Sequence, residues 1–185
     1  MRGNLGGVYL AIVENNQLDE RGRISIMIPH SDHAGSYPAY IASFMAGDQR
    51  GALFLPEKKD QVLVAFVNGV SDAPVVIGSL WSQTDKPPES NANGENDVKL
   101  IKTRAGNEIR ITDKNNTEKI EIAGKEGKTR VVLDIANTTI EITTEEKVTA
   151  KAKKIALDGD VDISGKLVVG SSSKTTIDGN KITGG

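Results

Sequence analysis

Residues 109–142 read IRITDKNNTEKIEIAGKEGKTRVVLDIANTTIEI. Pairs of apolar residues separated by one residue recur in this stretch, first every eleven residues and later at shorter intervals. Strict alternation of apolar and polar residues is typical of a short β-strand with one buried face. The intervals leave room only for tight turns, so the stretch predicts a ladder of narrow strands, as in a β-helix or a fibre.

The same pattern continues toward the end of the chain. Its apolar positions are Ile109, Ile111, Ile120, Ile122, Val131, Leu133, Ile140, Ile142, Val148, Ile155, Leu157, Val161, Ile163, Leu167 and Val169, followed by the single Ile177 and Ile182. Ordering one residue costs about 1 to 2 kcal/mol, whereas a fully buried Ile or Val contributes roughly 1.5 to 3 kcal/mol. The two apolar side chains of each short strand bury too little surface to stabilise a single chain, so partner chains must cover them.

The composition excludes several classes of protein. Aromatic residues make up only 4% of the 185 residues, and every Phe, Tyr and Trp precedes residue 82. A globular domain of ~100 residues normally fills its core with several aromatic rings, so the second half of the chain is not of that kind. The absence of cysteine excludes disulfides and thiolate metal ligands. A formal net charge of -2 gives no electrostatic basis for binding nucleic acid or an anionic membrane.

The chain divides into two parts at a polar connector. Residues 86–97 contain a pair of prolines followed by Asn, Gly and acidic residues, a composition that joins neither a sheet interior nor a helix. We therefore expect a barrel domain over residues 1–85, a linker over 86–98 and a strand ladder over 99–185. In the first part the expected strands are Gly7–Glu14, Gly22–Met27, Ala39–Phe44, Gly51–Leu55, Gln61–Val67 and Pro74–Leu80. Their number and spacing predict a small closed barrel.

One segment of the first part fits two structures. Between Ala34 and Ala46 the apolar residues Tyr37, Tyr40, Ile41 and Phe44 are three and four positions apart, as on a short helix. The same residues also fit a strand in which Tyr40 and Ile41 face opposite sides.

Several phrases of the first part occur in a specific order. They are Gly7-Val8, Gly22-Arg23-Ile24, Gly51-Ala52-Leu53-Phe54-Leu55-Pro56-Glu57, Gln61-Val62-Leu63-Val64-Ala65-Phe66 and Asp72-Ala73-Pro74-Val75-Val76-Ile77-Gly78-Ser79-Leu80-Trp81. In this order they resemble the oligonucleotide-binding-type (OB) barrel of contractile-tail spike proteins. That family includes the baseplate protein V spikes of phages, the VgrG proteins of type VI secretion and the spikes of extracellular injection particles. After the connector, Lys102-Thr103-Arg104-Ala105-Gly106-Asn107-Glu108-Ile109 resembles the Lys-Thr-Arg-Ser-Gly-His motif with which the family's triple-stranded β-helix begins.

The resemblance implies a fold, an assembly and a set of partners. The fold would be all-β, with an N-terminal OB-fold barrel followed by an intertwined triple-stranded β-helix in a homotrimer. The apolar positions from Ile109 to Val169 would then form the trimer core. The function would be that of a central spike, a structural protein that links a baseplate hub to the tip and mechanically pierces the target-cell envelope. We expect no enzymatic activity and no cofactor.

The partners implied by the resemblance are two further copies, a hub protein and the target envelope. A separate PAAR-type tip cap is expected as well, because the His-x-His pair of self-capped phage spikes is missing near residue 185. No apolar run has the length of a signal peptide or a membrane span. We therefore expect assembly in the bacterial cytoplasm, without a signal peptide, into a phage tail or a phage-tail-like particle.

Other types of site find weaker support. His30, Asp32 and His33 could supply two imidazoles and a carboxylate to a metal, but zinc takes three or four ligands and no further ligand cluster is obvious, so a polar loop is the better explanation. Asp158, Asp160 and Asp162 alternate with Val161 and Ile163, which places them on a solvated face. Lys147, Lys151 and Lys153 fit the same explanation. No nucleophile elbow or phosphate loop occurs, and the adjacent Glu145 and Glu146 would face opposite sides of a strand.

Two alternative functions stay open at this point. An OB barrel could bind an oligonucleotide by stacking bases on Tyr9, Phe44, Phe54, Phe66 or Trp81, although few basic residues lie near them in sequence. Of these rings, Phe54 and Phe66 lie in apolar strands and are expected in the core. A trimeric adhesive fibre would use the same strand ladder, but it predicts irregular or aromatic loops late in the chain, and the sequence has none.

Overall fold

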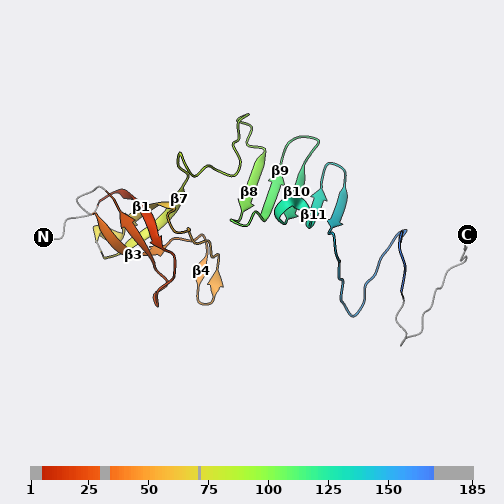
Figure 1. The fold of residues 1–185 in the computed structure, drawn as a ribbon, viewed down its shortest axis with the longest axis horizontal. Coiled ribbons are helices and arrows are strands. Elements are labelled where there is room, and N and C mark those ends of the chain that lie inside the picture. Colours follow the sequence, from red (N-terminus) through yellow and green to blue (C-terminus); the bar gives the residue numbers. More distant parts are fainter. Residues whose placement is uncertain (1–5, 30–33, 71, 169–185) are drawn as a thin grey trace, which may run out of the picture.

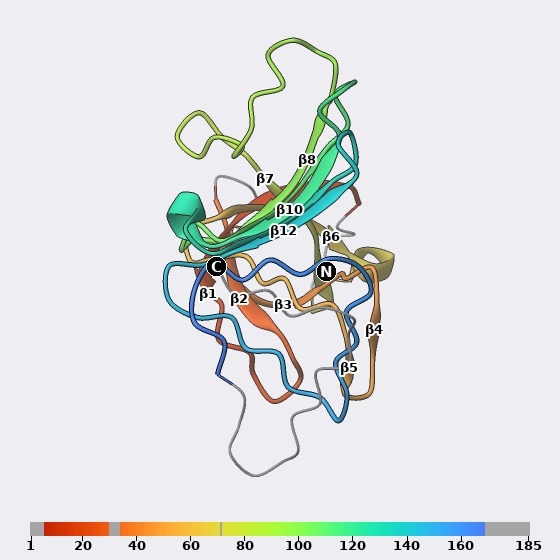
Figure 2. The same ribbon diagram turned by 90° about the vertical axis from the view of Figure 1, so that its right-hand side faces the viewer.

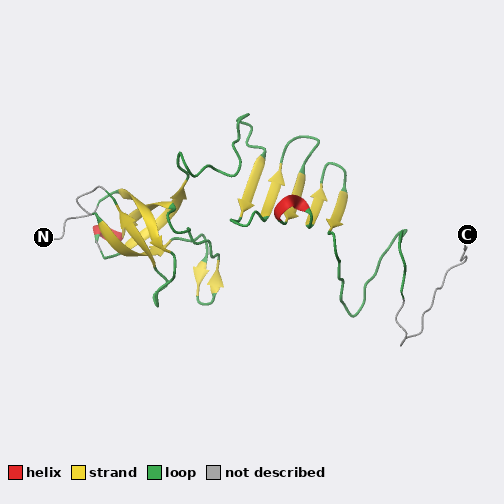
Figure 3. Ribbon diagram, viewed as in Figure 1, coloured by secondary structure: helices red, strands yellow, loops and turns green. Residues whose placement is uncertain are grey.

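The chain folds into strands, turns and extended segments. The computed structural model describes residues 6–29, 34–70 and 72–168. Its regular elements are β-strands and two 3₁₀ turns, η1 (Val67–Gly69) and η2 (Lys125–Gly127). Figure 3 shows that strands dominate both parts of the chain. The expected all-β class is therefore confirmed for the described residues.

The first part is a closed five-stranded barrel. Its strands are β1 (Val8–Asn15), β2 (Ile24–Ile28), β3 (Gly35–Ile41), β6 (Gln61–Phe66) and β7 (Pro74–Leu80). Their order around the barrel is β1-β2-β3-β7-β6, and β6 pairs with β1 to close it. The β3–β7 pair is parallel and the other pairs are antiparallel. The OB-like barrel expected from the sequence is confirmed (Figure 1).

The barrel holds the aliphatic core of the molecule. Successive side chains of a strand point to opposite faces, and the inward set of β2 consists of Ile24, Ile26 and Ile28, each at most 1% exposed. Val62 and Val64 of β6 oppose them from across the barrel and are fully buried. The ring of Phe66 closes one end of this core in edge-on contact with Tyr9, with 5.4 Å between the ring centroids. The barrel thus completes its core within one chain.

The segment between β3 and β6 differs from the expectation. The helical alternative for residues 34–46 is wrong, because β3 occupies Gly35–Ile41 and a small hairpin of β4 (Ala46–Gly47) and β5 (Arg50–Gly51) follows. The strand expected over Gly51–Leu55 is wrong beyond Gly51. The barrel already closes through β6, so residues 52–55 find no free sheet position. A Cβ on Gly51 would lie 2.7 Å from the Met45 carbonyl oxygen, so the tight hairpin needs glycine there.

A second sheet follows the connector. Its strands are β8 (Val98–Lys102), β9 (Glu108–Thr112), β10 (Lys119–Ala123), β11 (Arg130–Asp134) and β12 (Thr139–Thr143). Each strand pairs antiparallel with its sequence neighbour, in the order β12-β11-β10-β9-β8. Figure 1 shows that the strands lie across the long axis of the molecule and follow one another along it.

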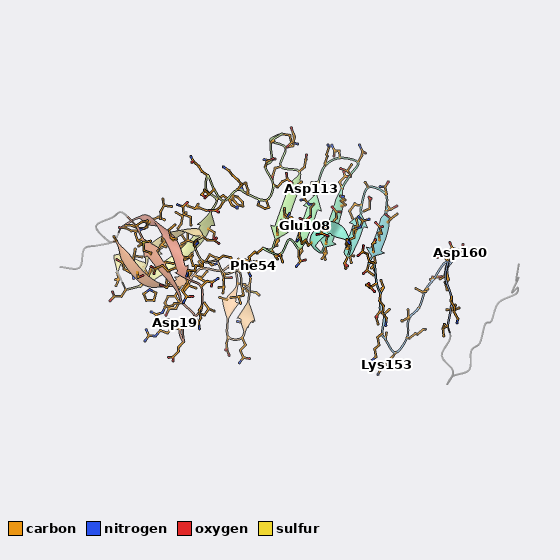
Figure 4. The ribbon with its side chains drawn as sticks, in the orientation of Figure 1. Asp19, Phe54, Glu108, Asp113, Lys153 and Asp160 are labelled. Atoms are coloured by element: carbon orange, nitrogen blue, oxygen red, sulfur yellow. The ribbon has the colours of Figure 1, made fainter. Side chains whose placement is uncertain are left out.

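Beyond β12 the described chain is extended. Residues 144–168 contain no strand and none of the backbone hydrogen bonds found among the described residues. In Figure 4 this segment turns back and forth across the long axis, with Lys153 at one bend and Asp160 at the next. Up to residue 168, pairing within one chain therefore ends at Thr143. The triple-stranded β-helix implied by the resemblance requires several copies of the chain and stays a prediction.

Candidate assembly surfaces

One face of the second sheet is aliphatic except for Lys99, which lies beside Ile111 on the edge strand β8. The strand register aligns Ile109 with Ile122, and Ile111 with Ile120, so the apolar pairs of successive strands lie side by side. Pairing of β10 with β11 and of β11 with β12 continues both rows across the sheet. We call this surface the apolar sheet face; it consists of Ile101, Ile109, Ile111, Ile120, Ile122, Val131, Leu133, Ile140 and Ile142.

The apolar sheet face is uncovered in a single chain. Ile140 and Ile142 at the β12 edge are 74% and 60% exposed, and Ile122 in the sheet centre is 53% exposed. Contiguous apolar patches of this kind on a soluble chain mark sites of interaction. The sequence-derived positions from Ile109 to Ile142 are therefore brought together on one surface, which the described part of the chain leaves uncovered.

The opposite face of the same sheet is suited to water. Cross-strand and neighbouring ion pairs run over it, and they join Lys102 to Glu108 (3.6 Å), Arg110 to Glu108 (3.2 Å), Lys119 to Glu121 (3.0 Å) and Arg130 to Glu141 (3.2 Å). Their aliphatic stems shield Val132, a buried residue of β11 on this side. Figure 4 shows Glu108 on β9 among these side chains. The sheet thus has one charged side and one apolar side.

The extended segment adds a second uncovered surface. Val148, Ile155, Leu157, Val161, Ile163 and Leu167 all lie on it, and each is more than half exposed. Because its backbone groups have no partners within the described chain, they are open to pairing with another chain. Val169, Ile177 and Ile182 lie outside the described residues. The structure does not bring this group of expected core residues onto the apolar sheet face.

A third apolar surface lies on the barrel. Phe44 and Phe54 flank the β4–β5 hairpin with their ring centroids 6.5 Å apart, and they are 85% and 63% exposed. Met45 and Leu53 extend the same surface, which borders a cavity of about 570 Å³. We call these four residues the hairpin patch. Figure 4 places Phe54 on the side of the barrel nearest the second sheet.

The sequence analysis missed the hairpin patch. It assigned Phe54 to the core, and the structure corrects this, because only Phe66 of that pair is buried. The turn at Gly47-Asp48 is evident from the sequence, but it was overlooked that the stretch from Gly47 to Gly51, with glycine at both ends, lies between the two aromatic residues. Gln49 in this turn has a φ of 51°, typical of a tight hairpin.

Among the described residues, one ion pair joins the second sheet to the barrel and another joins it to the connector. Arg104, in the β8–β9 turn, donates to Glu57 on the barrel at 2.9 Å. Arg110 of β9 donates to Glu89 of the connector at 3.2 Å, and this contact is made on the charged side of the sheet. The connector therefore lies on the side opposite the apolar sheet face.

The β1–β2 connection is held by one carboxylate. Asp19 accepts hydrogen bonds from the backbone N–H groups of Arg21 and Arg23 and from the Arg23 guanidinium, whose nearest nitrogen is 2.7 Å away. The hydrogen bond from the Arg23 side chain is the main reason that the pKa of Asp19 is lowered to about 2. This arrangement is a structural turn that positions the barrel strands.

Among the residues it describes, the structure does not bring the candidate metal-binding or charged residues together into a site. Within the described ranges, no group of three His, Cys, Asp or Glu side chains could hold a metal ion. His30 and His33 lie outside the described residues. Asp158, Asp160, Asp162, Lys147, Lys151 and Lys153 are all exposed on the extended segment. In the same described residues, no helix is long and apolar enough to cross a membrane.

The fold places the chain in a class, and comparison with known proteins gives its family. The class is an all-β protein whose N-terminal part is an OB-like closed barrel. Residues 9–81, which contain this barrel, match the family of the type VI secretion system/phage-baseplate injector OB domain. This part of the chain is therefore an injector OB domain, and the comparisons support a relation to VgrG-like baseplate and spike proteins. The family resemblance drawn from the sequence is thereby confirmed.

Individual relatives extend the similarity beyond the barrel. The type VI secretion system spike protein VgrG2a of Pseudomonas aeruginosa is 27% identical over 131 residues, covering 60% of this chain and 15% of its own length. VgrG3 of Vibrio cholerae, also named a spike protein, is 27% identical over 111 residues, which are 55% of this chain and 11% of that protein. The actin cross-linking toxin VgrG1 of Vibrio cholerae is 31% identical over 75 residues, or 38% and 7% of the two chains. The matches thus span only a small part of each relative.

Proposed function

We propose that this chain is the structural central spike of a contractile tail or injection particle. The observation that carries the proposal is an injector OB barrel followed by a sheet whose aliphatic face is uncovered. A surface of that kind is stable in water only when it is covered. In a homotrimer, three apolar sheet faces would meet around one axis while the three charged faces point to solvent.

The proposed division of the chain is a barrel over residues 1–85, a linker over 86–98 and a spike over 99–185. The trimer core of the spike would comprise the aliphatic positions from Ile109 to Val169. Strands β9, β10 and β11 are paired by hydrogen bonds on both sides within one chain, so there the three copies would join by packing of their apolar faces. Residues 144–168 lack such bonds, so in this segment the three chains would exchange hydrogen bonds and wind into a triple-stranded β-helix.

The proposed mechanism is mechanical. Contraction of a sheath would push the spike forward, and a prism whose three chains share each rung would resist bending. The barrel end would meet a baseplate hub, and the far end would carry a separate PAAR-type tip cap toward the target-cell envelope. The spike would be assembled in the bacterial cytoplasm and become part of a phage tail or tail-like particle. No enzymatic step and no cofactor is needed for this role.

The mass of the purified protein in solution tests this proposal. Multi-angle light scattering of the full chain at low micromolar concentration should give the mass of three chains. The trimer should persist on dilution, because interwound chains separate only by unfolding. A stably folded monomer, with the strand content of the sheet retained by circular dichroism, would contradict the spike assignment. Retardation of a labelled oligonucleotide that weakens with salt would instead favour the nucleic-acid alternative.

A further inference from the structure

The hairpin patch is an apolar surface that the barrel itself does not use. Phe44, Met45, Leu53 and Phe54 lie outside the closed barrel core, and all four are more than half exposed. Among the residues that line the adjoining cavity, Arg50 alone is charged. A nucleic-acid surface would need a basic groove beside the aromatic rings. The chemistry of the patch fits another apolar protein surface.

The hairpin lies on the side of the molecule where further copies are needed. Glu89 of the connector contacts Arg110 on the charged side of the second sheet, which places the connector on that side. Figure 2 looks along the long axis and shows the connector on one side of the sheet, with β4, β5 and residues 144–168 on the other. The hairpin patch, the apolar sheet face and the unpaired segment therefore share one side.

We propose that the hairpin patch docks onto the barrel of a second copy of this chain. This inference rests on the proposed spike function, because the copies that cover the apolar sheet face would stand on the side toward which the hairpin projects. In a three-fold ring each patch would contact the next subunit, so the contact is repeated three times and closes. The barrels would then be joined to one another directly, in addition to being tethered through the spike.

Thiol reactivity distinguishes a docked patch from a free one. The chain has no cysteine, so Leu53→Cys and Val67→Cys each introduce a single thiol. Leu53 is 73% exposed and Val67 is 50% exposed in one chain, so a free patch predicts that Leu53→Cys reacts at least as fast. Val67 lies in η1 at the barrel end away from the hairpin (Figure 3), which makes it the matched control.

The expected result is a reversal of the order that exposure predicts. In the assembled full chain, the Leu53→Cys thiol should react with a small aromatic disulfide reagent about tenfold or more slowly than the Val67→Cys thiol, because a buried site reacts only when the interface opens. In urea the two rates should become equal. Both positions are on the surface of one chain, so neither change should prevent folding, and circular dichroism checks this.

The outcomes separate the two proposals. If the variants are trimers and Leu53→Cys reacts as fast as Val67→Cys, the docking inference is wrong and the spike function stands. If the wild-type chain is a folded monomer, the spike function itself fails. Protection of Leu53→Cys that arises only after a hub protein is added would also overturn the docking inference, because the patch would then have a different occupant.

Discussion

The barrel and the second sheet are built from the same aliphatic residues but bury them differently. Ile24, Ile26 and Ile28 of β2 are enclosed by the barrel, whereas Ile109, Ile122 and Ile142 stand on an open surface of the sheet. Both regions complete most of their backbone pairing within one chain. Hydrogen bonding therefore orders the strands in both regions. Only a sheet that closes into a barrel also buries its apolar side chains within a single chain. The barrel is a complete folding unit, and the sheet is one third of one under the proposed assembly.

The strongest test of this contrast is a charge on the apolar sheet face. Ile142→Asp would bring three carboxylates together in a dry interior, and a buried charge without a partner is costly enough to prevent assembly. Light scattering should therefore show loss of the trimer, while near-ultraviolet circular dichroism of the aromatic residues, all of which precede residue 82, keeps the barrel signal. Glu141→Gln on the same strand is the matched control. It removes only an exposed ion pair with Arg130, worth less than about 1 kcal/mol. Equal melting curves for the two variants would refute the assigned faces.

The stability lost through a cavity in the barrel core should not depend on assembly. Ile26→Ala removes a fully buried side chain, and such truncations cost about 2 to 5 kcal/mol. Because the barrel core is completed within one chain, this loss should be similar in the trimer and in a chain that carries Ile142→Asp. Chemical unfolding monitored by the near-ultraviolet signal measures it. Ile26→Val, at about 0.5 to 1.5 kcal/mol, gives a graded control. A loss that appears only in the assembled protein would mean that the barrel core is shared between chains.

Proteolysis tests where the two regions separate. Residues 86–96 are all exposed and contain no large aliphatic or aromatic side chain, so a glutamate-specific protease should cut first in this connector, after Glu89 or Glu95. The expected product is a C-terminal fragment that keeps the mass of three chains on size-exclusion chromatography with light scattering. Residues 144–168 contain Glu145 and Glu146 and are equally open in one chain. Early cuts there would show that this segment is not covered by partner chains.

The smallest expected effect concerns acid stability of the barrel. Asp19 has its pKa lowered to about 2, first by the hydrogen bond from the Arg23 side chain. The pKa of an unfolded Asp is about 3.9, so its stabilising contribution is complete above that pH and is lost as the pH falls toward the folded value. Between about pH 4 and about pH 2, the melting temperature of the barrel should fall less steeply in Asp19→Asn than in the wild type. Parallel profiles for the two proteins would show that this turn does not contribute.

Alternation in the sequence predicted which residues share a face, and the structure explains what it could not predict. Ile140 and Ile142 lie on one side of β12 and Glu141 on the other, as strict alternation requires. Alternation does not determine which strands pair, so the self-paired sheet up to Thr143 was not foreseen. The phrase from Gly51 to Leu55 looked like a core strand because its residues are apolar. It was excluded from the sheet by the closure of β6 onto β1, a long-range contact that local sequence does not encode.

The end of intrachain pairing at Thr143 has a consequence for the order of events during synthesis. Each strand of the second sheet pairs with its neighbour in sequence, and hairpins of this kind close in about 1–10 μs once both strands have left the ribosome. Residues 144–168 emerge later and have no such partner among the described residues. Under the proposed assembly, three nascent or released chains would meet with the barrel and the second sheet already folded and the segment after Thr143 still unpaired. Winding of the three chains would then proceed from the barrel toward the tip. The slow, concentration-dependent step would then involve the segment after Thr143, which is translated after the self-paired strands.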